Sequence, residues 1–297
     1  MAGLGSVARA ISAGLRRAVA GQTTSERLIG TLIQESVQND LFYVCYQPKV
    51  DLRTGLTTGA EALLRTNFQS KSIFSIADII ELAERTGDIR AITKFVLSSV
   101  KRDLDSLVGI DPKLQVSVNI SAELISHTGY AKQLIKDLDG YAERIILEIT
   151  ETAFVHSPEV AHKNLSELVA AGFKLSLDDY GVGYSSLEQL QRMPIHELKI
   201  DRSFISNIQE SHRGPLIVRS TIDMAHAMEL TVVAEGVEDG TTLALLAIMG
   251  CDFIQGFYIA KPMPLTDFQA FLSDQLAADK VKQAQQPASM FEFAVNQ

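Results

Sequence analysis

Short apolar runs rich in β-branched residues alternate along the chain with longer segments in which apolar residues recur every three or four positions. The short runs predict strands and the longer segments predict helices. The predicted strands are Leu41–Gln47, Thr58–Leu64, Leu114–Ile120, Arg144–Thr150, Phe173–Asp178, Glu197–Ile200, Leu230–Glu235 and Phe253–Gln255. Near-continuous apolar strands are typical of a mostly parallel sheet covered on both faces. Eight such strand–helix units in about 250 residues predict an α/β fold of the (β/α)8 type, with an open doubly wound sheet as the alternative.

Two helices carry signals at both of their ends. Ser157 followed by Pro158 predicts an N-cap and a first helical position, and Gly172 predicts where that helix ends. A second helix is expected to begin at Ser75 and to end before Gly87. Both helices lie between predicted strands, as a strand–helix repeat requires.

The two ends of the chain differ from the middle. Residues 1–23 contain three arginines and no acid. Apolar residues recur there with helical spacing at Leu4, Val7, Ile11, Leu15 and Val19. This pattern predicts a basic amphipathic helix that contacts a membrane surface or a protein partner, with a poorly ordered leader as the alternative. We expect the main domain to span residues 24–275 and a helix end and tail to occupy residues 276–297.

Composition narrows the function classes. The chain has 297 residues, 46% hydrophobic and 21% charged, which is typical of a globular protein. Its formal net charge of −9 argues against a nucleic-acid polymer as partner, but a bound metal would still allow a small anionic ligand. Two cysteines, Cys45 and Cys251, exclude a disulfide framework and a zinc site built from cysteines. No apolar run reaches the roughly 18 residues of a membrane span, so we expect a cytoplasmic protein, peripheral to a membrane at most.

Polar side chains gather near the carboxyl ends of the predicted strands. They are Glu61, Asn119, Glu148, Asp178, Asp179, Lys199, Glu235 and Gln255. Because the carboxyl ends of barrel strands share one mouth, we expect these side chains to converge there. Any one of these acids could instead be a helix cap or a surface charge. Several such residues in this arrangement favour a functional site.

Five carboxylates at one mouth need compensating positive charge, since unpaired buried charge is costly. Lys199 supplies one charge, and divalent cations are the natural remainder. The expected ligands carry oxygen donors only: Glu61, Asn119, Glu148, Asp178 and Asp179. Such a set favours Mg²⁺ or Mn²⁺ over zinc, and two ions about 4 Å apart are the usual apparatus for cleaving a phosphodiester. The six histidines form no HExxH or His-Asp motif, which argues against zinc hydrolysis.

Eight blocks of sequence extend this interpretation. They are YQPKVDLRTG (46–55), EALLR (61–65), VNIS (118–121), LEITE (147–151), DDYGVGYSSL (178–187), KIDRSF (199–204), AEGVE (234–238) and CDFIQGFYIAKPMP (251–264). In this order they resemble the EAL-domain cyclic di-GMP phosphodiesterases, over about residues 25–275. The resemblance implies a modified (β/α)8 barrel whose first strand is antiparallel, and a homodimer. It also implies hydrolysis of cyclic di-GMP to linear 5′-pGpG with two Mg²⁺ or Mn²⁺ ions.

The resemblance also assigns expected roles to individual residues. Glu61, Asn119, Glu148 and Asp178 match the ligands of the first metal, and Asp178 and Asp179 match those of the second. Lys199 matches a lysine near the nucleophilic water, and Glu235 a general base or an orienter of that water. Glu151 matches an acid that orders the loop after the aspartate pair and links it to dimerisation. Gln47 and Arg65 match substrate-binding positions, and Gln255 and Glu238 match positions that line the site.

One atypical segment and two alternative functions remain to be considered. Thr66 stands where the family often has tryptophan, and residues 66–74 lack the usual proline-rich lead into the next helix, which affects how substrate packs on that side. Some family members bind cyclic di-GMP without cleaving it, so a receptor is the main alternative to a hydrolase. An interaction protein that uses residues 1–23 is a third reading, and it is compatible with catalysis.

Overall fold

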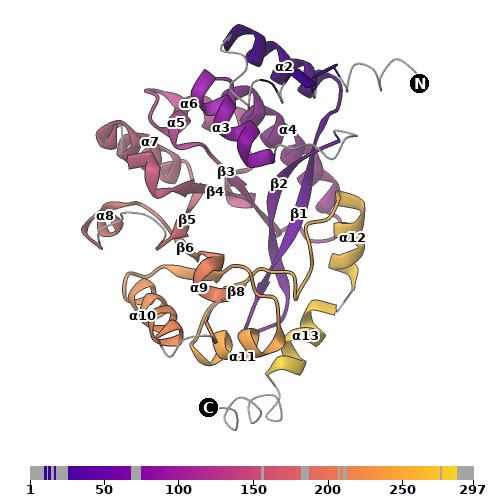
Figure 1. Ribbon diagram of the computed structural model, residues 1–297. Helices are drawn as coiled ribbons and strands as arrows, with labels where there is room; N and C mark the ends of the chain where they lie inside the picture. The colour runs from indigo at the N-terminus through magenta and orange to yellow at the C-terminus, as the bar shows by residue number, and fades with distance from the viewer. Residues whose placement is uncertain are drawn as a thin grey trace.

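The computed structural model describes residues 10–11, 13–14, 17, 26–67, 75–154, 157–181, 187–206, 208–209, 213–274 and 276–285. Its strands close into a single barrel in chain order (Figure 1). They are β1 (Phe42–Asp51), β2 (Thr57–Thr66), β3 (Gln115–Asn119), β4 (Ile145–Thr150), β5 (Lys174–Tyr180), β6 (Glu197–Ile200), β7 (Thr231–Ala234) and β8 (Phe253–Ile254). The closed barrel rules out the open doubly wound sheet.

The first strand runs against its neighbours, as expected. β1 pairs antiparallel with both β2 and β8, and every neighbouring pair from β2 to β8 is parallel. Only the short segment 52–56 joins β1 to β2. Such a link suits a hairpin, because a parallel crossover needs a dozen residues or more.

Helices surround the strands on the outside of the barrel (Figure 1). They are α2 (Glu26–Gln38), α3 (Ile76–Thr86), α4 (Ile89–Leu107), α5 (Ala122–Ile125), α6 (Tyr130–Asp137), α7 (Pro158–Ala170), α8 (Leu187–Arg192), α9 (Arg202–Ser206), α10 (Gly214–Ala227), α11 (Gly240–Ile248), α12 (Leu265–Ser273) and α13 (Leu276–Ala284). Two 3₁₀ turns, η1 (Ala142–Arg144) and η2 (Glu151–Phe154), flank β4.

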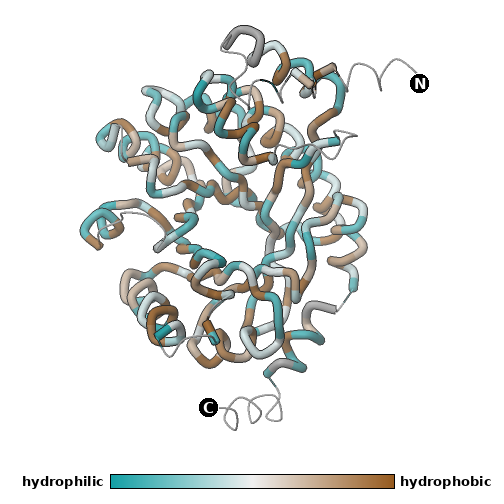
Figure 2. The backbone as a smooth tube through the Cα atoms, in the orientation of Figure 1, coloured by the Kyte–Doolittle hydropathy of each residue, from teal (hydrophilic) through white to brown (hydrophobic). Residues whose placement is uncertain are grey.

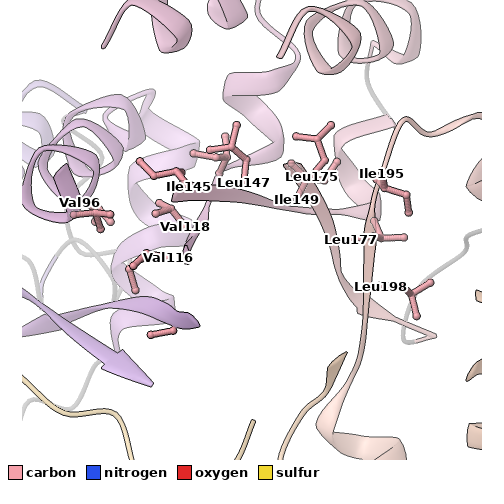
Figure 3. Packing of buried hydrophobic residues seen from close by; sticks show 14 of the residues in the cluster. Val96, Val116, Val118, Ile145, Leu147, Ile149, Leu175, Leu177, Ile195 and Leu198 are labelled. Carbon is pink, nitrogen blue, oxygen red and sulfur yellow. The ribbon is translucent and has the colours of Figure 1, made fainter. Parts of the chain in front are cut away.

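The hydrophobic core lies between the strands and this helical layer. Val116 and Val118 of β3 and Leu147 of β4 are fully buried and point away from the barrel axis (Figure 3). Because side chains alternate along a strand, the intervening residues face the barrel interior. Figure 2 shows both hydrophobic and hydrophilic positions along the strands that ring the barrel. The apolar half of each strand therefore holds the fold together, and the polar half is left for the interior.

The predicted helix boundaries are confirmed with one correction. Ser75 caps α3 by accepting a hydrogen bond from the Asp78 backbone N–H, and Gly87 ends α3 in the left-handed conformation with a φ of 75°. Helix α7 begins at Pro158 as predicted, but the Ser157 side chain makes no capping hydrogen bond. The proline itself fits the first helical position, because its fixed φ suits the helix and its missing N–H would have had no partner within it.

The ends of the chain are only partly described. In the predicted amphipathic segment Ile11 is helical and buried, and Gly14 approaches Leu32 of α2 closely. Most of residues 1–23, and the tail from 286 onward, lie outside the described residues. Among the helices that are described, none combines the length and the apolar character needed to cross a bilayer.

The loops after β7 and β8 pack backbone against backbone. Gln255 accepts a hydrogen bond from the Val237 N–H at 3.2 Å, and the Tyr258 N–H donates to the Val237 carbonyl at 2.9 Å. A Cβ atom on Gly256 would lie against the Val237 backbone, closer than real Cβ atoms approach. Glycine at this position therefore allows the two loops, which follow Ala234 and Ile254, to meet.

We expect Gly256→Ala to destabilise the protein by about 1–3 kcal/mol, because the added methyl group must push two backbones apart. Thermal or urea unfolding measures this change. Gly109→Ala is the matched control, since no atom lies within 4 Å of a Cβ there. Equal stability of the two variants would contradict the close packing of these loops.

Candidate functional site

Lys199 of β6 lies at the centre of a buried cluster of charges. The side chain is only 1% exposed. Four carboxylates from four other strands or strand ends surround its ammonium group. The Nζ atom lies 2.6 Å from Glu235 Oε1, 3.0 Å from Glu148 Oε2, 3.0 Å from Asp178 Oδ1 and 3.7 Å from Glu61 Oε2.

Three amide side chains, from β1, from β3 and from the end of β8, extend this cluster around Glu61 of β2. Asn119 Nδ2 donates to Glu61 Oε1 at 2.9 Å, and Gln255 Nε2 donates to Glu61 Oε2 at 2.7 Å. Gln255 also donates to Gln47 Oε1 at 3.0 Å, and Gln47 Nε2 donates to the Ala260 carbonyl at 3.2 Å. These bonds fix the orientation of both Glu61 oxygens.

Strand register brings these residues together from distant parts of the chain. Gln47 of β1 lies opposite Glu61 of β2, and Asn119 of β3 lies opposite Glu148 of β4. All four face the barrel interior, while alternate residues such as Val118 pack outward on the helices. The same two-residue period that builds the core thus aims the polar side chains at one mouth.

The aspartate pair depends on an irregularity in β5. Neighbouring residues on a regular strand point to opposite faces. Here the register with β6 shifts between Leu177 and Tyr180, and Asp179 has a φ of 55°. A bulge of this kind turns a side chain toward a new direction. Carboxylate oxygens of Asp178, Asp179 and Glu235 consequently lie within 4.8 Å of one another.

Burial and mutual repulsion change the acidity of the cluster. Burial raises the pKa of Glu148 well above its usual value, although the Lys199 ammonium acts in the opposite direction. Burial also raises the pKa of Glu235 to about 7, with Lys199 again opposing the shift and Asp178 and Glu61 adding to it. For Lys199, burial favours the neutral amine, but the surrounding carboxylates together raise its pKa.

The donor set fits divalent cations. Five carboxylates (Glu61, Glu148, Asp178, Asp179 and Glu235) and one ammonium group leave four formal negative charges when all are ionised, which is the charge of two divalent cations. Every candidate ligand offers oxygen, as Mg²⁺ and Mn²⁺ prefer. The carboxylates of Asp178, Asp179 and Glu235, which all lie within 4.8 Å of one another, are close enough to share an ion. The charge and the donor chemistry of these residues therefore fit divalent cations.

Two predicted residues lie outside the charged cluster. Arg65 is four residues beyond Glu61 on the same face of β2, about 13 Å along the strand, and its guanidinium donates to the Leu64 carbonyl at 2.8 Å. Glu238 pairs with Arg202 at 2.7 Å, and both side chains are roughly half exposed. Both residues thus border the mouth instead of joining the cluster within it.

Glu151 lies in η2, directly after β4. With Tyr180 and Gly181 it lines a cavity of about 280 Å³ beside α10. Gly181, two residues after Asp179, has a φ of 101°, a conformation that glycine adopts without steric cost. Residues 182–186, which include Gly183, lie outside the described residues. Glu151 is thus adjacent to the start of the loop that it is expected to order.

Sequence reasoning missed a second buried ion pair in the barrel. Lys49 of β1 and Glu197 of β6 are joined by a contact of 2.8 Å, with side chains only 7% exposed each. Lys49 lies two residues after Gln47, and Glu197 lies two residues before Lys199, and both Gln47 and Lys199 are predicted site residues. This spacing was the available signal, because residues two apart on a strand share a face.

Comparisons with known proteins connect this chain to a family. The family model described as "EAL domain" matches residues 32–262. The chain is 34% identical over 244 residues to the cyclic di-GMP phosphodiesterase PdeR of Escherichia coli, covering 81% of this chain and 37% of that protein. It is 34% identical over 255 residues to the cyclic di-GMP phosphodiesterase NbdA of Pseudomonas aeruginosa, covering 84% of this chain and 33% of that protein. The chain thus spans about a third of the length of these curated relatives.

Solved structures show the same architecture. The PaMucR phosphodiesterase in complex with c-di-GMP superposes with a TM-score of 0.75 at 32% identity, over 81% of this chain and 99% of that one. The EAL enzyme Bd1971, in its cAMP- and cyclic-di-GMP-bound form, gives a TM-score of 0.79 at 29% identity, over 87% and 72% of the two chains. From the match of sequence, fold and strand order together, this chain belongs to the EAL-domain family.

Proposed function

We propose that the protein is a metal-dependent phosphodiesterase that hydrolyses cyclic di-GMP to linear 5′-pGpG. The observation that carries the proposal is the complete cluster of buried carboxylates around Lys199. The relatives PdeR and NbdA are named cyclic di-GMP phosphodiesterases, and this supports cyclic di-GMP as the proposed substrate.

In this proposal Glu61, Asn119, Glu148 and Asp178 hold one divalent cation, and Asp178 and Asp179 hold the second. Bound Mg²⁺ or Mn²⁺ would supply Lewis acidity for activating water and would neutralise charge on the phosphoryl oxygens. The hydrogen bonds from Asn119 and Gln255 to Glu61 already orient that carboxylate. Such oriented ligands reduce the reorganisation that binding requires.

The chain's own residues then prepare the attacking water. Glu235 is the proposed base, because its carboxylate lies within 4.8 Å of those of Asp178 and Asp179, the proposed ligands of the second cation. Its side chain is 18% exposed and so remains accessible from the mouth. Lys199 stabilises negative charge beside the reacting phosphate and fixes Glu235 through their 2.6 Å contact.

Substrate binding is assigned to the β1–β2 wall and to β8. Cyclic di-GMP carries two phosphates, and Arg65 on the rim of β2 offers a cation to one of them. Gln47 and Gln255, whose amides are hydrogen-bonded to each other, are the proposed polar contacts to the substrate on this wall. Since the whole chain is acidic, local charge must attract the substrate.

A receptor that binds cyclic di-GMP without cleaving it is the competing function. The expected ligand set is complete in this chain, and a receptor has no need of a carboxylate near the water or of the Lys199 ammonium. This completeness favours the hydrolase. Any contact of residues 1–23 with a membrane or a protein partner is a separate role that does not conflict with catalysis.

Incubation with cyclic di-GMP and Mg²⁺ or Mn²⁺, followed by chromatography, tests the proposal. We expect pGpG to form in the wild type and Glu61→Ala to lower its rate by about a hundredfold or more, because a ligand of the first cation is lost. Glu188→Ala is the matched control, since this exposed carboxylate pairs with Arg192 on the surface of α8. Undiminished pGpG formation by Glu61→Ala would refute the assignment, and binding without turnover in the wild type would favour the receptor.

Stability in EDTA should depend on pH through Glu235. Its pKa of about 7 in the fold exceeds its ordinary value of 4.5, so between these values the folded protein keeps a proton that the unfolded chain has released. This difference makes stability fall as pH rises through that window. We expect Glu235→Gln to flatten this part of a plot of Tm against pH, and Mn²⁺ to raise the wild-type Tm most at the upper end. Asp223→Asn, at an exposed pair with Arg219, should leave the slope unchanged.

We also propose that the protein forms a homodimer through α10. Leu216 and Ile217 are 67% and 48% exposed there. Ile217 also lines the cavity that contains Glu151 and Tyr180, so this surface is continuous with the end of β5. Pairing of two such surfaces would bury apolar area and connect the dimer to the aspartate pair.

Light scattering tests the dimer. We expect Leu216→Glu to yield monomers, because a charged group at an apolar contact is costly to bury. Leu56→Glu is the matched control: Leu56 is 60% exposed but lies in the turn between β1 and β2. If the two variants have the same mass in solution, α10 is not the interface.

A further inference from the structure

The buried pair of Lys49 and Glu197 lies in the barrel interior beside the charged cluster. Lys49 Nζ contacts Glu197 Oε2 at 2.8 Å across the barrel, from β1 to β6. The Phe253 ring of β8 lies 5.4 Å from the same Nζ atom and covers it. The mechanism proposed above uses neither charge, yet burying two charges is costly unless they are paired.

Glu197 and Lys199 are neighbours on one face of β6. They are two residues apart, which separates their Cα atoms by about 7 Å. A lysine and a glutamate at that spacing are long enough to form an ion pair with each other. Instead, Lys199 contacts Glu148, Asp178 and Glu235, and Glu197 contacts Lys49.

Other groups near Glu197 are weak substitutes for Lys49. Ser176 of β5 is its register partner, and the Ser176 hydroxyl is fully buried. Among the described residues, neither that hydroxyl nor Glu197 Oε1 has a hydrogen-bond partner. A neutral hydroxyl cannot balance a buried carboxylate, so a Glu197 without Lys49 would attract another ammonium. The Lys199 ammonium is available on the same face of β6, two residues away along the strand.

We infer that Lys49 is a positioning residue. Because it forms an ion pair with Glu197, the Lys199 ammonium stays directed at Glu148, Asp178 and Glu235. The inference rests on the proposed function, because it concerns the lysine assigned to that reaction. Lys49 acts through another side chain and does not touch the substrate. Its removal has two consequences with opposite signs. Catalysis loses the Lys199 ammonium, whereas the carboxylate cluster becomes more negative and binds divalent cations more tightly.

Lys49→Met tests the inference with two measurements. We expect kcat for cyclic di-GMP to fall by about tenfold or more, with KM changed much less, since the loss concerns the reacting centre. Isothermal titration with Mn²⁺ alone should show the dissociation constant falling by about tenfold, which corresponds to 1.4 kcal/mol. General damage to the fold would weaken Mn²⁺ binding, so tighter binding together with slower turnover is specific to a redirected Lys199.

The double variant Lys49→Met with Glu197→Gln supplies the rescue. Without the Glu197 charge, Lys199 has no competing partner, so kcat and Mn²⁺ affinity should return toward wild-type values. Lys132→Met, at an exposed position on α6, is the control for a lysine lost elsewhere. If Lys49→Met does not fold, Lys49→Gln replaces it, because glutamine keeps a hydrogen-bond donor for Glu197. In this variant kcat and the Mn²⁺ dissociation constant should both fall, but by less than in Lys49→Met.

Two results would overturn the inference: Mn²⁺ binding in Lys49→Met that is unchanged or weaker than in the wild type, or a double variant as slow as Lys49→Met. Failure of the proposed function gives a different result, because the wild type itself would then form no pGpG. The Mn²⁺ titration needs no turnover and therefore tests the position of Lys199 separately.

Discussion

One ammonium group, that of Lys199, allows several carboxylates to share the interior of this barrel. Four of them lie within 3.7 Å of its Nζ atom, and the side chain is almost fully buried. Without this charge, the acids could keep their positions only by taking up protons or cations. Even with it, burial and, to a smaller extent, the neighbouring carboxylates raise the pKa of Glu148 and of Glu235, and the ionised cluster carries an excess of negative charge. That excess is what gives the site its affinity for positive ions in the proposed mechanism.

The barrel can accommodate this charge because its stability comes from elsewhere. Outward residues such as Val118 and Leu147 are packed between strands and helices, where they exclude water on the far side of the sheet. The interior is therefore free to hold polar side chains, provided that each is paired. The amides of Asn119 and Gln255 and the Lys49–Glu197 pair meet that condition at successive positions along the strands. Fold and site thus use alternate residues of the same strands.

Departures from regular geometry occur where the site needs them. A regular β5 would direct Asp178 and Asp179 to opposite faces, but the shift in register and the positive φ of Asp179 bring both toward Glu235. The backbone contact between Gly256 and Val237 similarly holds the loops that follow Gln255 and Glu235. Such strained or crowded positions are maintained by the packing around them, and they often mark functional sites.

The sequence by itself determined all eight strands, the bounds of α3 and α7 to within a residue or two, and which polar residues stand near strand ends. These features follow from local periods, caps and breakers, which depend on neighbours in the chain. The antiparallel first strand and the identity of the family came from ordered motifs. Only the tertiary structure decided that Lys199 contacts four carboxylates, that Lys49 occupies Glu197, and that Arg65 lies apart from the cluster. Pairings between residues as far apart in sequence as Gln47 and Gln255, 208 positions, depend on barrel closure and register, and a one-residue shift would exchange inside for outside.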